Sequence, residues 1–376
     1  MEKRKIASLD AEVSLLGFGL MRLPTINGES SKIDYPKAQA MIDRAFRAGV
    51  NYFDTAYVYH GKTSEVFAGE TLSRYPRDSY YLATKMPTWD PVRTEDDVAR
   101  IFDEQMSKCR TSYFDFYLVH SLNAERIDTL DRNIYRYLRK KKEEGAIRRL
   151  GFSFHDHSGS LKEIVNRYEW DFVQVQINYV DWDTADAKIL YDTLTDKGLP
   201  VIVMEPIKGG TLARLNDQTM NVLKKCDPQA GAASWALRFA ASLPNVMTVL
   251  SGMTEPEHVE ENIKTFSPFR PLSDAERGAL AEAVVAYHST GTIPCTGCRY
   301  CMECPSGVEI PKVLAQYNHY LLTKNKVNYE NQYCTLRDSE KAHNCVNCGK
   351  CVKLCPQKIN IPVHMKEVAD FFGAQM

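Results

Sequence analysis

Short apolar runs alternate with longer amphipathic segments through most of this chain, and this alternation restricts its fold more than any other feature. The runs lie at residues 15–21, 50–54, 80–85, 114–120, 147–154, 172–178, 200–205 and 246–251. Between them apolar residues recur at helical spacing, as Ala38, Met41 and Ile42 do in segment 36–48. Strands that alternate with helices in this way over about 250 residues are typical of a (β/α)8 TIM barrel.

A doubly wound open sheet is the alternative α/β fold. Such a sheet usually begins with a G-x-G-x-x-G turn between its first strand and first helix. Here Gly17-Phe-Gly19-Leu-Met-Arg lacks the third glycine, and Leu-Pro follows it instead of a helix. The sequence therefore favours the barrel.

The chain after the barrel is predicted to form a smaller, mostly helical domain. We expect the barrel at residues 1–270, a linker helix at 271–293 that Ser273 caps, and a ferredoxin-like domain at 294–376. Helical patterns at 310–322 and 363–372 lie within this last part.

Eight of the 11 cysteines fall in two short groups within the last predicted domain. These groups are Cys295, Cys298, Cys301 and Cys304, and Cys345, Cys348, Cys351 and Cys355. Three thiolates at C-x2-C-x2-C spacing bind one iron–sulfur cube, and a fourth cysteine followed by proline normally binds the other. The sequence thus predicts two [4Fe–4S] clusters. Four-cysteine zinc sites are the competing interpretation. The shorter spacing between Cys301 and Cys304 requires a different backbone path there.

Composition and charge favour a cytoplasmic protein with small-molecule and redox partners. A net charge of −1 gives no basic surface for nucleic acid or an anionic membrane. We find no apolar run of about 18 residues and no apolar signal region after the basic start of the chain. Cysteines clustered in C-x2-C steps indicate metal binding in a reducing compartment.

Titratable residues end three successive predicted strands, at Asp54, Lys85 and His120, and Tyr59 follows in the adjoining loop. Catalytic groups of a TIM barrel lie at this carboxyl-terminal face. A lysine beside a tyrosine favours the phenolate, and an aspartate keeps that lysine in place and charged. The set predicts carbonyl reduction, or the reverse alcohol oxidation, with Tyr59 as general acid and His120 as donor to the substrate oxygen.

These residues lie in motifs that resemble those of the aldo/keto reductases. The motifs are Phe53-Asp54-Thr55-Ala56-x-x-Tyr59, Ser64-Glu65, Ala83-Thr84-Lys85, Leu118-Val119-His120, Gly151-Phe-Ser153, Gln174-x-x-x-Asn178, Glu205-Pro206-x-x-Gly209-Gly210 and Glu261-Asn262. With the cysteines, the chain resembles the bacterial and archaeal branch that carries a ferredoxin-type extension.

The resemblance implies a nicotinamide cofactor, NAD(P)H, across the barrel mouth and a catalytic tetrad of Asp54, Tyr59, Lys85 and His120. Ser153 and Gln174 would hold the carboxamide, segment 205–212 would follow the pyrophosphate, and Asn262 would approach the adenosine. The full set of implied cofactor contacts is Met21, Asp54, Ser153, Gln174, Glu205, Pro206, Lys208, Gly210, Leu212, Gly252, His258, Glu261 and Asn262.

Two departures from the family pattern concern the cofactor. Relatives that prefer a 2′-phosphate usually have Lys and Arg where this chain has Gly252 and His258, so the choice between NADH and NADPH stays open. The usual Tyr-Ser pair after the seventh strand is Met204-Glu205 here.

A hydride carries two electrons, whereas each cube passes one. Three hypotheses address this difference: the barrel holds FMN, which splits electron pairs; nicotinamide chemistry runs alone beside structural clusters; or the barrel is silent and the chain is an electron-transfer or regulatory subunit. A ferredoxin, a flavodoxin or another redox protein is the expected partner of the clusters.

Overall fold

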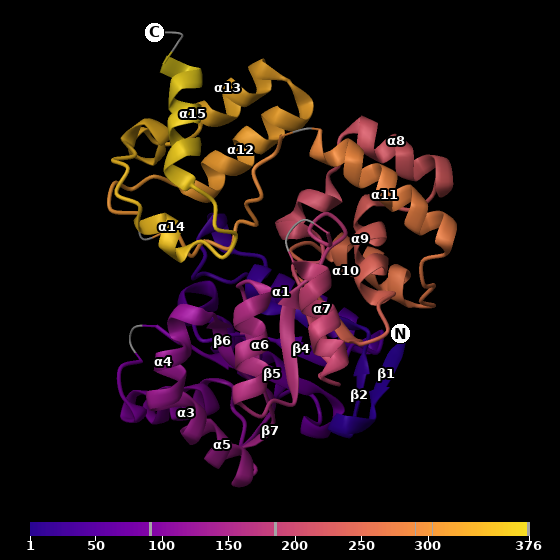
Figure 1. Ribbon diagram of the computed structural model, residues 1–376, viewed down its shortest axis with the longest axis vertical. Coiled ribbons are helices and arrows are strands. Elements are labelled where there is room, and N and C mark those ends of the chain that lie inside the picture. The colour runs from indigo at the N-terminus through magenta and orange to yellow at the C-terminus, as the bar shows by residue number, and fades with distance from the viewer. Residues whose placement is uncertain (90–91, 184–185, 290, 303, 374–376) are drawn as a thin grey trace. The chain divides into compact units, whose positions relative to one another are not determined.

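In the computed structural model, eight parallel strands close into a barrel, as the alternation predicts (Figure 1). Around the barrel they follow the order β10-β3-β4-β5-β6-β7-β8-β9. Their bounds are β3 (Leu16–Gly19), β4 (Tyr52–Asp54), β5 (Tyr81–Met86), β6 (Phe114–Leu122), β7 (Ile147–Phe154), β8 (Phe172–Gln176), β9 (Val201–Met204) and β10 (Val246–Ser251). The structure describes residues 1–89, 92–183, 186–289, 291–302 and 304–373.

The register of the strands brings the predicted catalytic residues to one end of the barrel. Gly19 pairs with Asp54, Asp54 with Ala83, and Lys85 with Leu118. Because all neighbours are parallel, their carboxyl ends meet at one rim, where the (β/α)8 fold builds its sites.

A hairpin that the sequence pattern did not predict closes the opposite end. It consists of β1 (Lys3–Ile6) and β2 (Ala11–Ser14), which pair antiparallel. Leu9 and Val13 from this hairpin pack with Tyr52, Phe116 and other side chains inside the barrel. The hairpin therefore shields the bottom of the barrel core from water.

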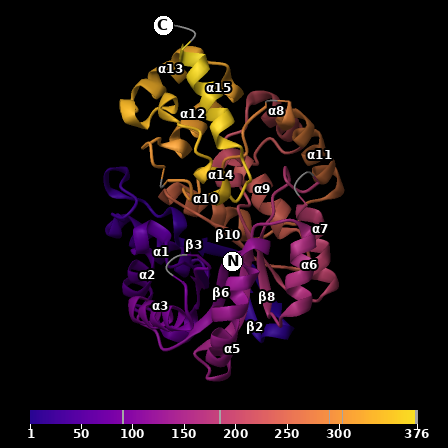
Figure 2. The ribbon, with the colours of Figure 1, turned by 60° about the vertical axis from the view of Figure 1, so that its left-hand side comes forward.

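Helices surround the barrel (Figure 2). They begin and end close to their predicted bounds. They are α1 (Tyr35–Arg47), α2 (Ser64–Leu72), α3 (Glu95–Lys108), α4 (Ile127–Thr129), α5 (Tyr135–Glu143), α6 (Ser158–Arg167), α7 (Ala187–Asp196), α9 (Ala232–Ala241) and α10 (Pro256–Phe266). A π-helical segment, Leu130–Ile134, joins α4 to α5, so the single helix expected over 127–144 is interrupted. The expected start of α7 at residue 184 lies outside the described residues.

The chain divides into two compact units, Met1–Pro206 with Ala236–Leu272, and Ile207–Trp235 with Ser273–Met376. The second unit contains α8 (Asp217–Cys226), α11 (Asp274–His288), α12 (Ile310–Thr323), α13 (Lys326–Cys334), α14 (Lys350–Leu354) and α15 (Ile361–Gly373) (Figure 1). Ser273 caps α11 in a capping box with Glu276, as predicted. The domain boundaries at 270 and 293 stay a prediction. No described helix is both long and apolar enough to cross a membrane.

Candidate active site and cluster centres

The centre of the candidate site is the ammonium group of Lys85. This residue lies on β5, and its side chain is completely buried. Its Nζ donates to Asp54 Oδ1 at 2.6 Å and to the Thr55 carbonyl at 2.7 Å. Burial lowers the pKa of Lys85, and the attraction of Asp54 opposes this shift. Burial likewise raises the pKa of Asp54 against the attraction of Lys85. The two groups therefore depend on each other to remain charged away from water.

Tyr59 and His120 lie beside this pair. The Lys85 Nζ is 4.9 Å from the centroid of the Tyr59 ring. The Tyr59 and His120 rings meet edge to face with their centroids 5.9 Å apart. Burial, and then the charge of Lys85, hold the pKa of His120 well below its usual value. His120 is therefore a neutral imidazole near pH 7, with one N–H to donate. The fold thus brings together all four residues of the predicted tetrad.

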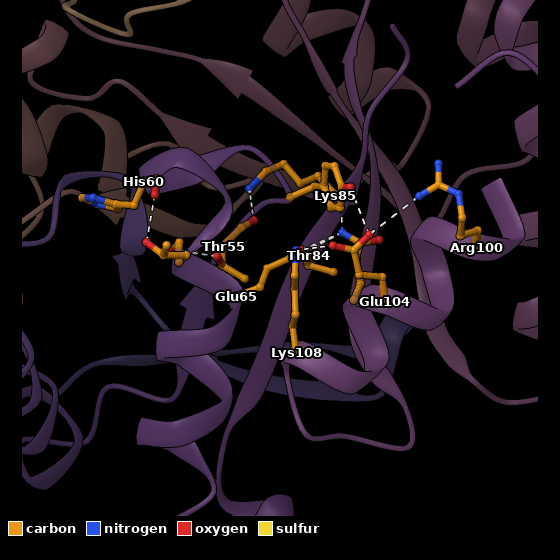
Figure 3. Close-up of polar contacts among 12 residues, drawn as sticks. Thr55, His60, Glu65, Thr84, Lys85, Arg100, Glu104 and Lys108 are labelled. Atoms are coloured by element: carbon orange, nitrogen blue, oxygen red, sulfur yellow. Dashed lines mark hydrogen bonds and ion pairs between the residues drawn. The ribbon is translucent and has the colours of Figure 1, made fainter. Parts of the chain in front are cut away.

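The buried carboxylate of Glu65 helps to hold the backbone of β5 at Lys85 (Figure 3). The sequence interpretation gave Glu65 no role. Glu65 Oε1 accepts hydrogen bonds from Thr84 Oγ1 and Gln105 Nε2, both at 2.6 Å. Gln105 Nε2 also donates to the Lys85 carbonyl at 3.0 Å. Burial raises the pKa of Glu65, while these hydrogen bonds oppose the shift. The helices α2 and α3 thereby fix the end of β5.

The end of strand β6, at His120 and Ser121, is held from two sides. Ser121 has a φ of 53°, and its N–H donates to Ser153 Oγ at 2.8 Å. Arg126 donates to the Ser121 carbonyl at 2.7 Å, and the Trp89 ring lies 5.1 Å from that of His120. Ser153, predicted to hold a carboxamide, is therefore also tied to the backbone beside His120.

Gln174, the other predicted carboxamide contact, is buried on β8. Its Nε2 lies 3.4 Å from the Met204 sulfur. Its Oε1 is buried and has no hydrogen-bond partner among the residues that the structure describes. A carboxamide N–H of a bound nicotinamide would satisfy this acceptor, so the residues present fit that group.

Two residues predicted to lie near the adenosine end of the cofactor, Asn262 and His258, make hydrogen bonds within the protein. Asn262 is buried and donates to Ser251 Oγ at 2.9 Å, whereas Glu261 is exposed on α10. His258 Nδ1 accepts from the N–H groups of Thr254 and Glu255, both at 3.3 Å, and so caps α10. Here His258 is therefore a capping residue at the start of a helix.

Three further predicted contacts, Met21, Glu205 and Gly252, lie beside a cation that the sequence interpretation overlooked. Met21 is half-buried in the turn after β3, and the next residue, Arg22, forms an ion pair with Glu205 at 3.6 Å. Gly252 lies under the Arg22 side chain. In the sequence, Arg22 is the basic residue that directly follows the predicted strand at 15–21. This position was the signal that could have pointed to it.

The remaining predicted contacts fall at or beyond the boundary between the two units. Pro206 ends a segment of the first unit. Lys208, Gly210 and Leu212 belong to the short helical segment Lys208–Ala213 in the second unit. Lys208 and Gly210 have positive φ values, 48° and 97°. Their role along a pyrophosphate stays a prediction.

The eight clustered cysteines surround two separate hollows in the second unit. One hollow is lined by Cys295, Cys298, Cys301 and Cys355. The other is lined by Cys345, Cys348, Cys351 and Cys304, and Cys301 lines both hollows. Each triplet thus meets the fourth cysteine of the other group, which is the crossed pattern that the spacing predicts.

The donor set of both hollows suits iron–sulfur cubes. All eleven cysteines are free thiols. No three His, Cys, Asp or Glu side chains in the described ranges are close enough to bind one metal ion together. Apolar side chains such as Val308, Leu314 and Met365 form the core against which the cysteines pack. Thiolates spread around an apolar-walled space fit a cluster of several irons.

The fold and the site define a (β/α)8-barrel oxidoreductase with an iron–sulfur extension. Residues 15–284 match the aldo/keto reductase family and residues 294–359 match the 4Fe-4S dicluster domain. The chain belongs to the aldo/keto reductase family.

Named relatives cover the barrel part of the chain. It is 25% identical over 305 residues to L-galactose dehydrogenase of Arabidopsis thaliana, with 76% of this chain and 94% of that protein aligned. It is 25% identical over 338 residues to the NADH-specific methylglyoxal reductase of Escherichia coli, with 76% and 99% aligned. The holo form of aldo-keto reductase AKR11C1 from Bacillus halodurans superposes with a TM-score of 0.64 at 25% identity, covering 75% of this chain and 96% of that one.

Proposed function

We propose that the barrel reduces a small carbonyl compound with NADH or NADPH, or oxidises the corresponding alcohol. The observation that carries this proposal is the buried Lys85–Asp54 pair, 2.6 Å apart, with Lys85 Nζ 4.9 Å from the Tyr59 ring. A relative is named as a methylglyoxal reductase and another as a sugar dehydrogenase, which supports chemistry between carbonyl and alcohol.

In this proposal the four residues manage one proton and one developing charge. Tyr59 gives its phenolic proton to the substrate oxygen. Lys85 stabilises the phenolate that remains, and Asp54 keeps Lys85 charged. His120, as the neutral imidazole, donates its N–H to the same oxygen and stabilises the charge that develops there. The nicotinamide, when bound, supplies or accepts the hydride. Ser153 and Gln174 would hold its carboxamide, and the family resemblance implies that segment 205–212 would hold its phosphates.

We further propose that the eight cysteines hold two [4Fe–4S] clusters, which pass single electrons to or from a partner such as a ferredoxin or flavodoxin. Cys295, Cys298, Cys301 and Cys355 would bind one cube. Cys345, Cys348, Cys351 and Cys304 would bind the other. Thiolates of this kind persist in a reducing compartment, which supports a cytoplasmic location.

The test of the barrel chemistry is replacement of Tyr59 by phenylalanine in the anaerobically purified, cluster-loaded protein. Loss of the hydroxyl should lower kcat for aldehyde reduction by at least about a hundredfold, because general acid catalysis contributes about 10² to 10⁴. Iron content and the affinity for NADPH should stay unchanged. Tyr57→Phe is the matched control, since the Tyr57 hydroxyl binds Glu104 on α3 instead. Equal turnover in the Tyr59→Phe variant would exclude the assigned role.

A second experiment concerns the electrons. Absorbance spectra before and after protein removal determine whether FMN is present. NADH or NADPH is then added to the anaerobic, oxidised protein. Bleaching of the iron–sulfur band without added flavin would support direct coupling between hydride chemistry and the clusters. An unchanged band would leave the clusters outside the barrel reaction.

A further inference from the structure

Three adjacent strand ends carry an arrangement that the tetrad does not use. Strand β10 lies between β9 and β3 in the barrel. Glu205 follows β9, Gly252 follows β10 and Arg22 follows β3. Arg22 and Glu205 form an ion pair at 3.6 Å. Because these residues come from the two strands that flank β10, their ion pair spans the end of β10.

The contacts around Arg22 show that its position is built into the fold. A Cβ placed on Gly252 would lie 3.1 Å from Cβ, Cγ and Cδ of Arg22. Any larger residue at 252 would therefore push the Arg22 side chain away. The Arg22 carbonyl accepts a hydrogen bond from Thr254 Oγ1 at 2.9 Å. Both the backbone and the side chain of Arg22 are thus fixed against the segment after β10.

Glu205 is held in an unusual conformation at the other side. Its φ is 54°, in the left-handed region that residues other than glycine seldom adopt. The pair remains partly open to water, with 30% of the Arg22 side chain and 15% of the Glu205 side chain exposed. An ion pair in contact with solvent contributes little net stability, so another anion can compete for the guanidinium.

Phosphate is the anion that suits this cation. A guanidinium can bind two phosphate oxygens at once through two parallel N–H donors. Relatives that prefer a 2′-phosphate usually have Lys and Arg at positions 252 and 258. In this chain position 252 is glycine, and His258 caps α10. Arg22 lies over Gly252. It therefore supplies a positive charge beside the position where relatives usually have the lysine.

We propose that Arg22 is a phosphate-binding residue of the cofactor site and that Glu205 competes with the cofactor for it. This inference rests on the proposed use of a nicotinamide dinucleotide. The phosphate is either the pyrophosphate, common to NADH and NADPH, or the 2′-phosphate of NADPH. Binding of the cofactor exchanges the Arg22–Glu205 pair for an Arg22–phosphate pair, and Glu205 weakens binding by the free energy of the pair that must open.

The experiment measures dissociation constants for NADH and NADPH by fluorescence titration of the cluster-loaded protein, without substrate. The variants are Arg22→Met, Glu205→Gln and the double variant. Arg22→Met should weaken binding by at least about tenfold, as expected for a charge-assisted hydrogen bond. Glu205→Gln should tighten binding by about two- to fivefold. Glu169→Gln is the control, because it opens an exposed pair with Arg139 far along the chain and should change nothing.

The double variant decides between competition and independent effects. If Glu205 acts only by occupying Arg22, Glu205→Gln has no effect in the Arg22→Met background, so the two effects are not additive. A loss in Arg22→Met for both dinucleotides assigns the pyrophosphate, and a loss for NADPH alone assigns the 2′-phosphate. Three outcomes would each overturn the inference while the proposed function stands. They are weaker binding by Glu205→Gln, additive effects in the double variant, and unchanged binding by Arg22→Met. Binding of neither dinucleotide by the wild type would overturn both.

Discussion

At the scale of single residues, the site is governed by charges that the barrel removes from water. Lys85 is fully buried, and so is Glu65. A buried charge is tolerated only when it is paired and hydrogen-bonded. Asp54 pairs with the Lys85 ammonium, while Glu65 binds the side chain of Thr84 and reaches the Lys85 carbonyl through Gln105.

Removal of the Glu65 carboxylate should destabilise the protein strongly. Glu65→Ala removes the buried acceptor that Thr84 Oγ1 and one Gln105 N–H share, which should lower the free energy of unfolding by about 2–4 kcal/mol. Urea denaturation measures this change. Glu163→Ala, which removes only an exposed contact with Arg167 at 3.8 Å, should change it by at most about 0.5 kcal/mol. Similar values for the two variants would contradict the role of Glu65.

The histidine after β7 should make stability depend on pH. Burial, and then the charge of Arg126, lower the pKa of His155 to about 4. An unfolded histidine takes up its proton near pH 6.5, so the unfolded state binds more protons between about pH 4 and 6.5. Stability should therefore fall as the pH drops through this window. The urea midpoint of the wild type should therefore fall further on acidification than that of His155→Gln, and an equal fall in both would refute the shift.

At the scale of elements, close helix packing places the residues behind Lys85. Glycine at position 69 lets α2 approach the end of α3, since a Cβ there would lie 2.2 Å from the Lys108 carbonyl oxygen. Helix α2 carries Glu65 and α3 carries Gln105, so their spacing sets the hydrogen bonds that fix the end of β5.

A pair of glycine-to-alanine variants tests this packing. Gly69→Ala should separate the two helices and lower the free energy of unfolding by about 1–3 kcal/mol, as overpacking usually does. Gly278→Ala, in α11, meets no atom within 4 Å and should stabilise the helix by about 0.5–1 kcal/mol. Thermal denaturation of both variants gives the comparison. Stabilisation by both would show that α2 has room for a side chain.

At the scale of the whole molecule, the cysteine hollows connect distant parts of the chain. Cys355 lines the hollow of the Cys295 triplet, and Cys304 lines that of the Cys345 triplet. Neither of the proposed cubes would then be a local motif. Each would require both cysteine groups, together with the helices between them, to be in place.

Double cysteine variants should show whether the fourth cysteine of each group binds the cube of the other group. Cys355→Ala should lose the cube that Cys295 binds, so Cys295→Ala with Cys355→Ala should lose no more iron than either variant alone. Cys345→Ala with Cys355→Ala should lose both cubes. Iron analysis and electron paramagnetic resonance after anaerobic reconstitution measure this, with Cys334→Ser, an exposed cysteine in neither hollow, as control. The reverse pattern would mean that each group binds its own cube.

Much of the fold could be predicted from local patterns. The apolar runs located all eight barrel strands, because a strand buried on both sides must be apolar along its length. Titratable residues at strand ends located Asp54, Lys85 and His120, because parallel strands end at one rim. The β1–β2 hairpin lacks a comparable pattern, since its burial depends on the closed barrel above it.

The sequence by itself determined the barrel, the rim that carries the tetrad, and the spacing of the cluster cysteines, because each depends on periodicity or local spacing. Only the tertiary structure decided that Glu65 supports Lys85 and that Arg22 lies over Gly252. These contacts join residues far apart in the chain. Their partners are chosen by how strands and helices pack, which no local pattern records.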